Sequence, residues 1–178
     1  AFATVLRSPV DHLISHLGWA LYLNEAQNEH RLSKQSPEVR QLCGYLRAFD
    51  LADEISLEEF VGDLPDIGHL FFNNSQTRYI SNRANKLKYS ESDGKTAAED
   101  LASFDCVGLS HDLESFLKGV GDLVGIPMAL GSTRENVLGN RFGIGRFQAF
   151  EEIVAPLICA DQILYESAVS LIQKRAVR

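Results

Sequence analysis

The sequence has 178 residues, of which 45% are hydrophobic and 23% charged, and its 17 basic and 24 acidic side chains give a formal net charge of −7. Such a chain can bury enough apolar surface to fold, which excludes bulk disorder. The acidic charge argues against non-specific nucleic-acid binding, because phosphates are neutralised by basic surfaces. No uninterrupted apolar run approaches the ~20 residues of a membrane-spanning helix. We therefore expect neither a nucleic-acid partner nor a membrane segment.

The three cysteines, Cys43, Cys106 and Cys159, lie far apart in the sequence. An odd number without a C-x-x-C pair argues against a disulfide framework and against a structural zinc site. We interpret all three as small apolar residues, which suits a reducing compartment. No signal peptide is recognisable, so the sequence favours a cytoplasmic location. The alternative that a missing N-terminal part carries a targeting or membrane segment stays open.

The first predicted elements are a strand and a helix joined by a short turn. Residues 2–6 are apolar and rich in β-formers. Ser8 then suits a helix N-cap, and Pro9 suits the first helical position. Apolar residues recur at helical spacing after Pro9, which predicts a helix over residues 9–23. A strand running into a helix is half of a βαβ unit.

The middle of the chain predicts further helices separated by polar segments. Ser36 and Pro37 predict the start of a second helix, and a capping box at residues 56–59 predicts a third that ends near Asp63. We expect a loop at residues 65–68 and a helix or ordered turn at residues 75–81. The polar residues 82–96 predict a mobile surface loop.

The C-terminal half predicts a second strand among helices. A short helix over residues 97–104 precedes a strand over residues 105–109, and Ser110 is expected to cap a helix that ends at Gly125. Residues 131–145 predict a loop. From residue 147 to residue 176 the pattern is helical, with Pro156 marking a break or a new start.

Two strands among many helices favour an α/β fold. We expect one domain over residues 1–178, with a partial parallel sheet flanked by helices and a helix-rich C-terminal part.

The strongest functional signal spans residues 4–16, which read TVLRSPVDHLISH. Arg7 follows the first predicted strand, and the carboxyl end of a parallel strand faces the crevice where α/β proteins bind ligands. Its planar guanidinium can hold a phosphate through two hydrogen bonds. Ser15 lies eight residues later, on the helix face opposite the apolar stripe, where its hydroxyl can donate to the same phosphate.

This segment resembles the 3′-phosphate-binding segment of the sulfotransferases that use 3′-phosphoadenosine 5′-phosphosulfate. In that family a strand ends in L-R-(D/N)-P-(V/L), and a serine follows the arginine by eight positions. Residues 74–81, NSQTRYIS, are similar to a second segment of the carbohydrate and membrane-type members. Residues 107–127, a V-G-L strand, a helix and a closing L-V-G-I-P, are similar to a third. Ser8 departs from the usual Asp or Asn, but serine also caps a helix.

The resemblance implies a P-loop-like three-layer fold and transfer of a sulfuryl group to a hydroxyl of a carbohydrate or other small acceptor, with adenosine 3′,5′-bisphosphate as the product. It implies that Arg7 and Ser15 hold the 3′-phosphate of the cofactor. Gln76 and Arg78 are expected either to line the acceptor or nucleotide site or to tie their loop to its neighbours.

In the family, the lysine-bearing phosphosulfate loop and the usual catalytic base precede the arginine strand. We therefore expect this chain to be the C-terminal two-thirds of such an enzyme, and its sequence identifies no catalytic base.

Two other interpretations stay open. The first is a catalytically incomplete relative that binds a nucleotide or a partner without transferring sulfate. The second is a metal hydrolase built on His12 and His16, which lie four residues apart on one helix face and have Asp11 or His69 as a conceivable third ligand. Because no complete metal-binding motif accompanies the pair, we expect no metal.

Overall fold

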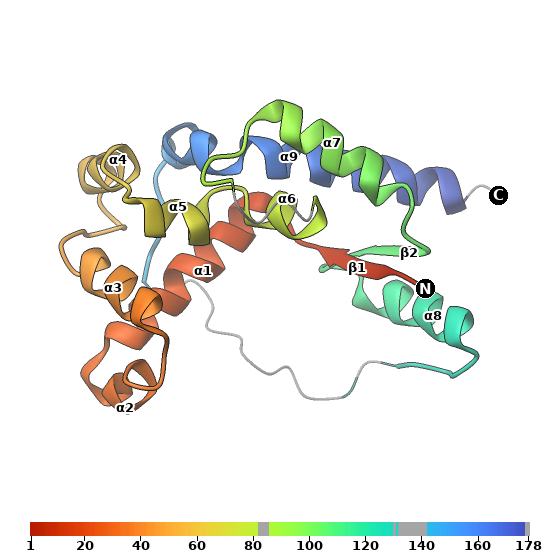
Figure 1. Ribbon diagram of the computed structural model, residues 1–178, viewed down its shortest axis with the longest axis horizontal. Coiled ribbons are helices and arrows are strands. Elements are labelled where there is room, and N and C mark those ends of the chain that lie inside the picture. Colours follow the sequence, from red (N-terminus) through yellow and green to blue (C-terminus); the bar gives the residue numbers. More distant parts are fainter. Residues whose placement is uncertain (82–85, 130, 132–141, 177–178) are drawn as a thin grey trace. The chain divides into compact units, whose positions relative to one another are not determined.

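The computed structural model describes residues 1–81, 86–129, 131 and 142–176 (Figure 1). These residues form a helix-rich α/β chain with one pair of parallel strands. In chain order the described elements are β1 (Ala3–Leu6), α1 (Pro9–Asn24), the 3-10 turn η1 (Ala26–Asn28), α2 (Glu29–Leu32), α3 (Pro37–Leu46), α4 (Glu54–Gly62), α5 (Asp66–Phe72), α6 (Ser75–Ile80), α7 (Glu91–Leu101), β2 (Cys106–Leu109), α8 (Leu113–Val124) and α9 (Phe150–Ala176).

The contacts divide the chain into two compact units. The first, here called the strand unit, comprises Ala1–Pro9, Asn74–Val137 and Cys159–Arg178. The second, here called the helical unit, comprises Val10–Asn73 and Leu138–Ile158. Each unit has its own hydrophobic core, and each is described by itself below.

The strand unit is built on β1 and β2, which pair in parallel with Leu6 opposite Leu109. The ladder continues past the strands, because the Ser110 N–H donates to the Leu6 carbonyl at 2.8 Å. Figure 1 shows α7 and α8 on opposite sides of the two strands. The partial parallel sheet predicted from the sequence is therefore confirmed. The buried apolar residues of this core are Leu6, Ala97, Leu101, Val107, Leu109, Leu164 and Ala168.

Two glycines of the strand unit let its elements approach closely. A Cβ added at Gly108 of β2 would lie 2.5 Å from the Phe116 Cβ of α8. A Cβ added at Gly94 of α7 would lie 2.5 Å from the Ala160 carbonyl oxygen and 2.9 Å from its Cα, both backbone atoms of α9. The second contact is the more restrictive, because backbone atoms cannot move aside as a side chain can.

Replacing Gly94 with alanine is therefore expected to destabilise the fold by about 1–3 kcal/mol, the usual cost of overpacking. Gly44 of α3 is the matched control, because no atom lies within 4 Å of the Cβ that alanine would add there. Gly44→Ala should stabilise the fold by up to about 1 kcal/mol through helix propensity. Urea unfolding of both variants checks this, and equal midpoints would contradict the close packing of α7 on α9.

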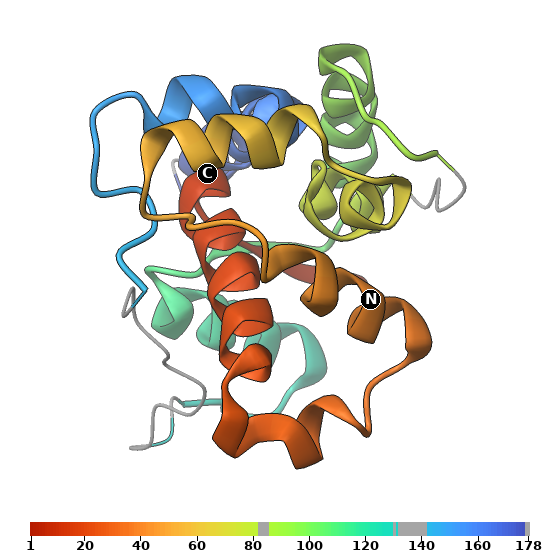
Figure 2. The same ribbon diagram turned by 90° about the vertical axis from the view of Figure 1, so that its left-hand side faces the viewer.

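The helical unit packs around α1, which lies beside α3 (Figure 2). The Asn24 side-chain amide donates to the Cys43 carbonyl at 2.6 Å, which ties the end of α1 to α3. The Ser36 hydroxyl accepts from the Val39 N–H and caps α3 as the sequence predicts. The buried core residues of the unit are Leu13, Leu17, Ala20, Leu23, Val39, Leu42, Cys43, Leu46, Leu51, Leu57, Phe60, Leu64, Phe72, Ile144, Phe150, Val154, Leu157 and Ile158.

Two predictions for the helical unit are wrong. The third predicted helix, α4, is capped by Asp53, whose carboxylate accepts from the Ser56 N–H at 2.9 Å, so Ser56 lies inside the helix. The predicted loop at residues 65–68 is instead the start of α5 (Asp66–Phe72). Pro65 occupies its N-cap, and Asp66 places negative charge in the first turn, where the helix dipole favours it. Burial of the Phe72 side chain stabilises this helix, although the sequence of residues 65–68 is typical of a turn.

The strand unit also departs from the sequence predictions at two helix starts. Helix α7 begins at Glu91, so the predicted loop over residues 82–96 is wrong from residue 91 onward, while residues 82–85 lie outside the described residues. A capping box formed by Ser90 and Asp93 starts this helix. Helix α8 is capped by Asp112, whose carboxylate accepts from the Ser115 N–H, and Ser110 does not cap it.

The C-terminal prediction is confirmed in its main feature, a long helix. Helix α9 contains Pro156 and continues through it, so the proline is neither a break nor a new start. Of the predicted loop over residues 131–145, residues 132–141 lie outside the described residues. By length and composition α9 could cross a membrane. This is weak evidence for a membrane-spanning segment, because the core helix of a soluble protein can have the same length and composition.

Candidate functional site

Arg7 occupies the first position after β1, at the carboxyl end of the parallel strand pair. Its side chain is exposed. Across the described residues its guanidinium has no hydrogen-bond or ion-pair partner. The carboxyl ends of parallel strands face the crevice in which α/β proteins bind ligands, so this cation is available at the position where the sequence predicts a phosphate ligand.

The backbone of Arg7, in contrast, is held firmly by one buried side chain. The Arg7 N–H donates to Gln76 Oε1 at 2.8 Å, and Gln76 Nε2 donates to the Arg7 carbonyl at 2.9 Å. Gln76 belongs to α6 and is only 5% exposed. Its amide therefore pairs with both backbone groups of Arg7 as a neighbouring strand would, while Ser110 pairs with the preceding residue, Leu6.

Gln76 is held in turn by a buried carboxylate on α9. Asp161 Oδ2 accepts from the Gln76 N–H at 3.2 Å, and Asp161 Oδ1 accepts from the Thr77 N–H at 2.6 Å. Burial raises the pKa of Asp161 to about 6, against the opposing effects of these N–H donors and of the positive charge on Arg78. Asp161 thus caps the short helix α6 from a distance of 85 residues in sequence.

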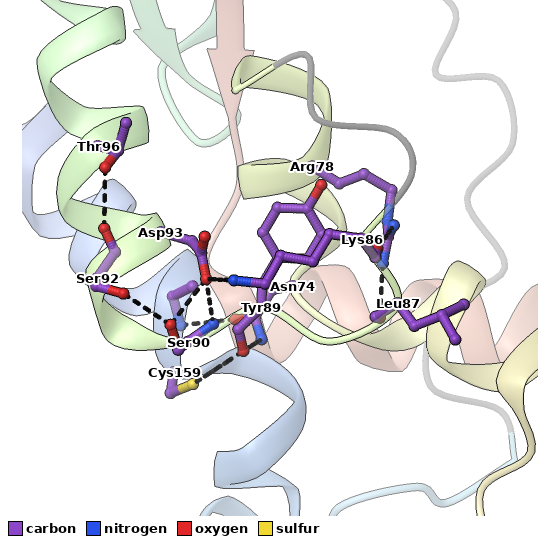
Figure 3. Close-up of polar contacts among 11 residues, drawn as sticks. Asn74, Arg78, Lys86, Leu87, Tyr89, Ser90, Ser92, Asp93, Thr96 and Cys159 are labelled. Atoms are coloured by element: carbon purple, nitrogen blue, oxygen red, sulfur yellow. Dashed lines mark hydrogen bonds and ion pairs between the residues drawn. The ribbon is translucent and has the colours of Figure 1, made fainter.

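Asn74 completes the network at the residue before α6. It is fully buried, and its φ of 47° lies in the left-handed region. Its Oδ1 accepts from the backbone N–H groups of Ala160 and Asp161 at 2.6 and 3.0 Å, and its Nδ2 donates to the Tyr89 carbonyl at 3.4 Å. Figure 3 shows Asn74 beside Tyr89. Asn74 and Asp161 therefore join the start of α6 to α9 from both sides.

Arg78, the fourth predicted site residue, points to a different part of the strand unit. Its Nη1 and Nη2 donate to the carbonyls of Lys86 and Leu87 at 2.5 and 3.1 Å. Its guanidinium carbon lies 4.7 Å from the centre of the Tyr89 ring, a cation–π contact (Figure 3). These contacts tie α6 to the segment that precedes α7, which is one of the two roles expected from the sequence.

A second buried carboxylate, Asp93, stabilises the start of α7 in the same region (Figure 3). Its burial pushes the pKa upward, but hydrogen bonds from Lys86 and Ser90 outweigh that effect and lower the pKa to about 2. Lys86 Nζ lies 2.5 Å from Asp93 Oδ2. Within the described residues, no hydrogen bond or ion pair links this pair to Arg7 or Gln76.

Ser15, the second predicted phosphate ligand, is exposed on α1. It belongs to the helical unit, whereas Arg7 belongs to the strand unit. Of the four predicted site residues, the structure brings Arg7 and Gln76 into direct contact and places Arg78 two residues beyond Gln76 on α6.

The histidine pair of the metal-hydrolase interpretation lies in the helical unit. The rings of His12 and His16 have their centres 4.2 Å apart, and His16 Nδ1 lies 3.4 Å from the Phe71 carbonyl oxygen. Within residues 1–81, 86–129, 131 and 142–176, no group of three or more His, Cys, Asp or Glu side chains is arranged to hold a metal ion. The third ligand that this interpretation needs is thus not found in the described part.

Sequence reasoning missed Asn74 as a structural residue and Asp161 altogether. Asp161 stands in the apolar run LICADQIL of a predicted helix, and a lone carboxylate on a buried helix face is a signal of a specific partner. Its partners on α6 could not be read from that signal.

Comparison with known proteins yields no match to a protein-family model, to a curated protein or to a solved structure.

Proposed function

We propose that this chain belongs to a sulfotransferase and binds the 3′-phosphate of 3′-phosphoadenosine 5′-phosphosulfate through Arg7. One observation carries the proposal: a buried amide fixes both backbone groups of Arg7, while its guanidinium has no partner among the described residues. An arginine that served only the fold would be expected to use its guanidinium, as Arg78 does.

The arrangement suits a phosphate for two physical reasons. The guanidinium offers parallel N–H donors that match two phosphate oxygens, and charge-assisted hydrogen bonds are roughly twice as strong as neutral ones. The fixed backbone lowers the entropy lost when the side chain binds, which is the benefit of a preorganised site. Ser15, eight residues after Arg7, remains the second ligand predicted from the sequence.

The fold offers further support for a P-loop-like architecture. Strand β1 runs into helix α1 through only two residues, Arg7 and Ser8, and β2 runs into α8 through three. Both strands therefore lead directly into helix N-termini at one edge of a parallel sheet, the arrangement in which α/β proteins bind phosphates.

When bound, the cofactor supplies the sulfuryl group, which passes to a hydroxyl of a carbohydrate or other small acceptor as adenosine 3′,5′-bisphosphate leaves. In this reaction Arg7 binds and orients the nucleotide at its 3′-phosphate, remote from the reacting sulfur. Binding energy from a remote group can then hold the reacting atoms in line.

A transfer assay tests the proposal. The protein is incubated with 3′-phosphoadenosine 5′-[³⁵S]phosphosulfate and a panel of carbohydrate acceptors, and labelled products are separated by chromatography. Label on at least one acceptor, lost with Arg7→Ala, would establish transfer, which needs a catalytic base that the sequence of this chain does not identify. Tight binding of the nucleotide without transfer would instead identify a catalytically incomplete relative. Absence of both binding and transfer would contradict the proposal.

A further inference from the structure

We infer that Asp161 is a positioning residue for the Arg7 phosphate site and that it acts through Gln76. This inference rests on the proposed function, because it concerns the same arginine. Asp161 itself lies on α9, and its carboxylate accepts hydrogen bonds from Gln76 and Thr77 rather than from Arg7.

The path from Asp161 to Arg7 consists of two buried links. Both carboxylate oxygens of Asp161 accept from N–H groups of α6, at 3.2 Å for Gln76 and 2.6 Å for Thr77. The side chain of Gln76 then bonds to both backbone groups of Arg7, at 2.8 and 2.9 Å. Asp161 is 3% exposed and Gln76 5%, so water has little access to replace either link.

The short helix α6 depends on Asp161 because it has no cap of its own. Asn74 occupies its N-cap position, but the Asn74 side chain makes no cap hydrogen bond to α6. Its Oδ1 accepts instead from Ala160 and Asp161 of α9. The carboxylate of Asp161 therefore supplies the acceptor for N–H groups at the start of α6 that would otherwise be buried without a hydrogen bond.

The chemistry of this contact requires two acceptor oxygens. Both oxygens of an ionised carboxylate accept hydrogen bonds, whereas an amide has one accepting oxygen and one donating nitrogen. In Asp161→Asn the side-chain NH₂ would meet a backbone N–H at Gln76 or Thr77, donor against donor. The start of α6 would shift, and the Gln76 side chain would lose its alignment with Arg7.

Protonation of Asp161 would weaken the same contact, because a protonated carboxyl oxygen carries a donor and accepts hydrogen bonds less well than a carboxylate oxygen. The pKa of about 6 places this event near neutral pH. Among the described residues, Arg78 on α6 is the charged group whose field lowers the pKa of Asp161. The residues that donate hydrogen bonds to Asp161, namely Gln76 and Thr77, are uncharged. The Cys159 thiol lies two residues before Asp161 on α9. Protonation also removes the cost of burying the charge, so the fold persists while the hold on Arg7 loosens.

The test measures the preference for a 3′-phosphate, defined as the affinity for adenosine 3′,5′-bisphosphate divided by that for adenosine 5′-phosphate. Asp161→Asn is expected to lower this preference by about 10-fold at pH 7.5, since small misplacements of a positioned group cost up to about 100-fold. Asp93→Asn is the matched control, because Asp93 is also a buried capping carboxylate of the strand unit and its hydrogen bonds are with Lys86 and Ser90. It should destabilise the fold and leave the preference unchanged.

A pH profile separates positioning from a purely structural role. Between pH 7.5 and pH 5.5 the preference of the wild type should fall more steeply than that of Asp161→Asn. The ligand phosphates titrate equally in both proteins, so the difference belongs to Asp161. Parallel profiles, or an unchanged preference in Asp161→Asn, would overturn the inference.

The outcomes also separate this inference from the proposed function. A wild type without any preference for the bisphosphate would refute the proposed function. A wild-type preference that Arg7→Ala abolishes and Asp161→Asn leaves intact would refute the positioning role alone. If circular dichroism shows that Asp161→Asn does not fold, Gln76→Met takes its place, because it removes both bonds to Arg7 and keeps the side-chain length. The same loss of preference is then expected, and an unchanged preference overturns the inference.

Discussion

Replacing Asn74 with alanine is expected to lower the free energy of unfolding by about 4 kcal/mol, because three buried hydrogen bonds and a favourable backbone conformation are lost together. The N–H groups of Ala160 and Asp161 lose the acceptor at 2.6 and 3.0 Å, and the Tyr89 carbonyl loses its donor. Each unsatisfied buried group costs about 1–3 kcal/mol. Chemical denaturation followed by far-UV circular dichroism measures the change.

Asn74→Gly is the matched variant, because glycine adopts a φ of 47° without steric cost. It loses the same side-chain hydrogen bonds, so the difference between the two variants isolates the backbone term, which should be about 1 kcal/mol in favour of glycine. A loss below about 1 kcal/mol for Asn74→Ala would contradict the network as described.

Arg7→Ala is expected to weaken binding of adenosine 3′,5′-bisphosphate by about 100-fold, the largest effect of any single substitution on the proposed ligand. Two charge-assisted hydrogen bonds contribute about 1.5–3 kcal/mol each, and solvent exposure of Arg7 keeps the total near the lower end. Because the guanidinium has no partner among the described residues, the stability of the fold should change by less than about 0.5 kcal/mol. Isothermal titration calorimetry measures the binding.

Two further variants define what Arg7 contributes. Arg7→Lys keeps the charge but loses the paired donors, so its affinity should lie between those of the wild type and Arg7→Ala. Arg40, an exposed arginine on α3 in the helical unit, is the control for net charge. If Arg40→Ala weakened binding as much as Arg7→Ala, the effect would come from overall charge and not from a specific site.

The local features of the fold could be predicted from the sequence. The run before Arg7 predicts β1, and helical spacing after Pro9 predicts α1, because period and capping residues act over a few positions. The sequence also identifies Gly125 as the residue after α8, where its φ of 70° suits glycine.

The missed start of α7 has a longer-range cause, whereas the caps of α4 and α8 were assigned to the wrong local residue. Gly94 and its polar neighbours have the composition of a loop, yet α7 forms there because the missing side chain lets it approach the α9 backbone at Ala160. That contact joins residues 66 positions apart (160 − 94 = 66). The amino-acid composition around Gly94 therefore does not predict this contact.

In the candidate site, too, the local features could be predicted from the sequence and the long-range contacts could not. The strand-end position of Arg7 and its chemistry are local and could be predicted. The hydrogen bonds between Gln76 and Arg7 join residues 69 positions apart, and the hydrogen bond between Asp161 and Gln76 joins residues 85 positions apart. The sequence left two roles open for Gln76, and only the three-dimensional contact shows that its amide bonds to the Arg7 backbone.

The most direct test of the central claim observes the Arg7 guanidinium itself. In a ¹⁵N-labelled protein, the Arg7 Nε–H resonance is assigned by its disappearance in Arg7→Lys, and adenosine 3′,5′-bisphosphate or adenosine 5′-phosphate is then titrated. A bound 3′-phosphate should shift this resonance with the bisphosphate and leave it in place with the 5′-phosphate. If the bisphosphate saturates the protein and the Arg7 resonance does not move, Arg7 is not the phosphate ligand and the account is contradicted.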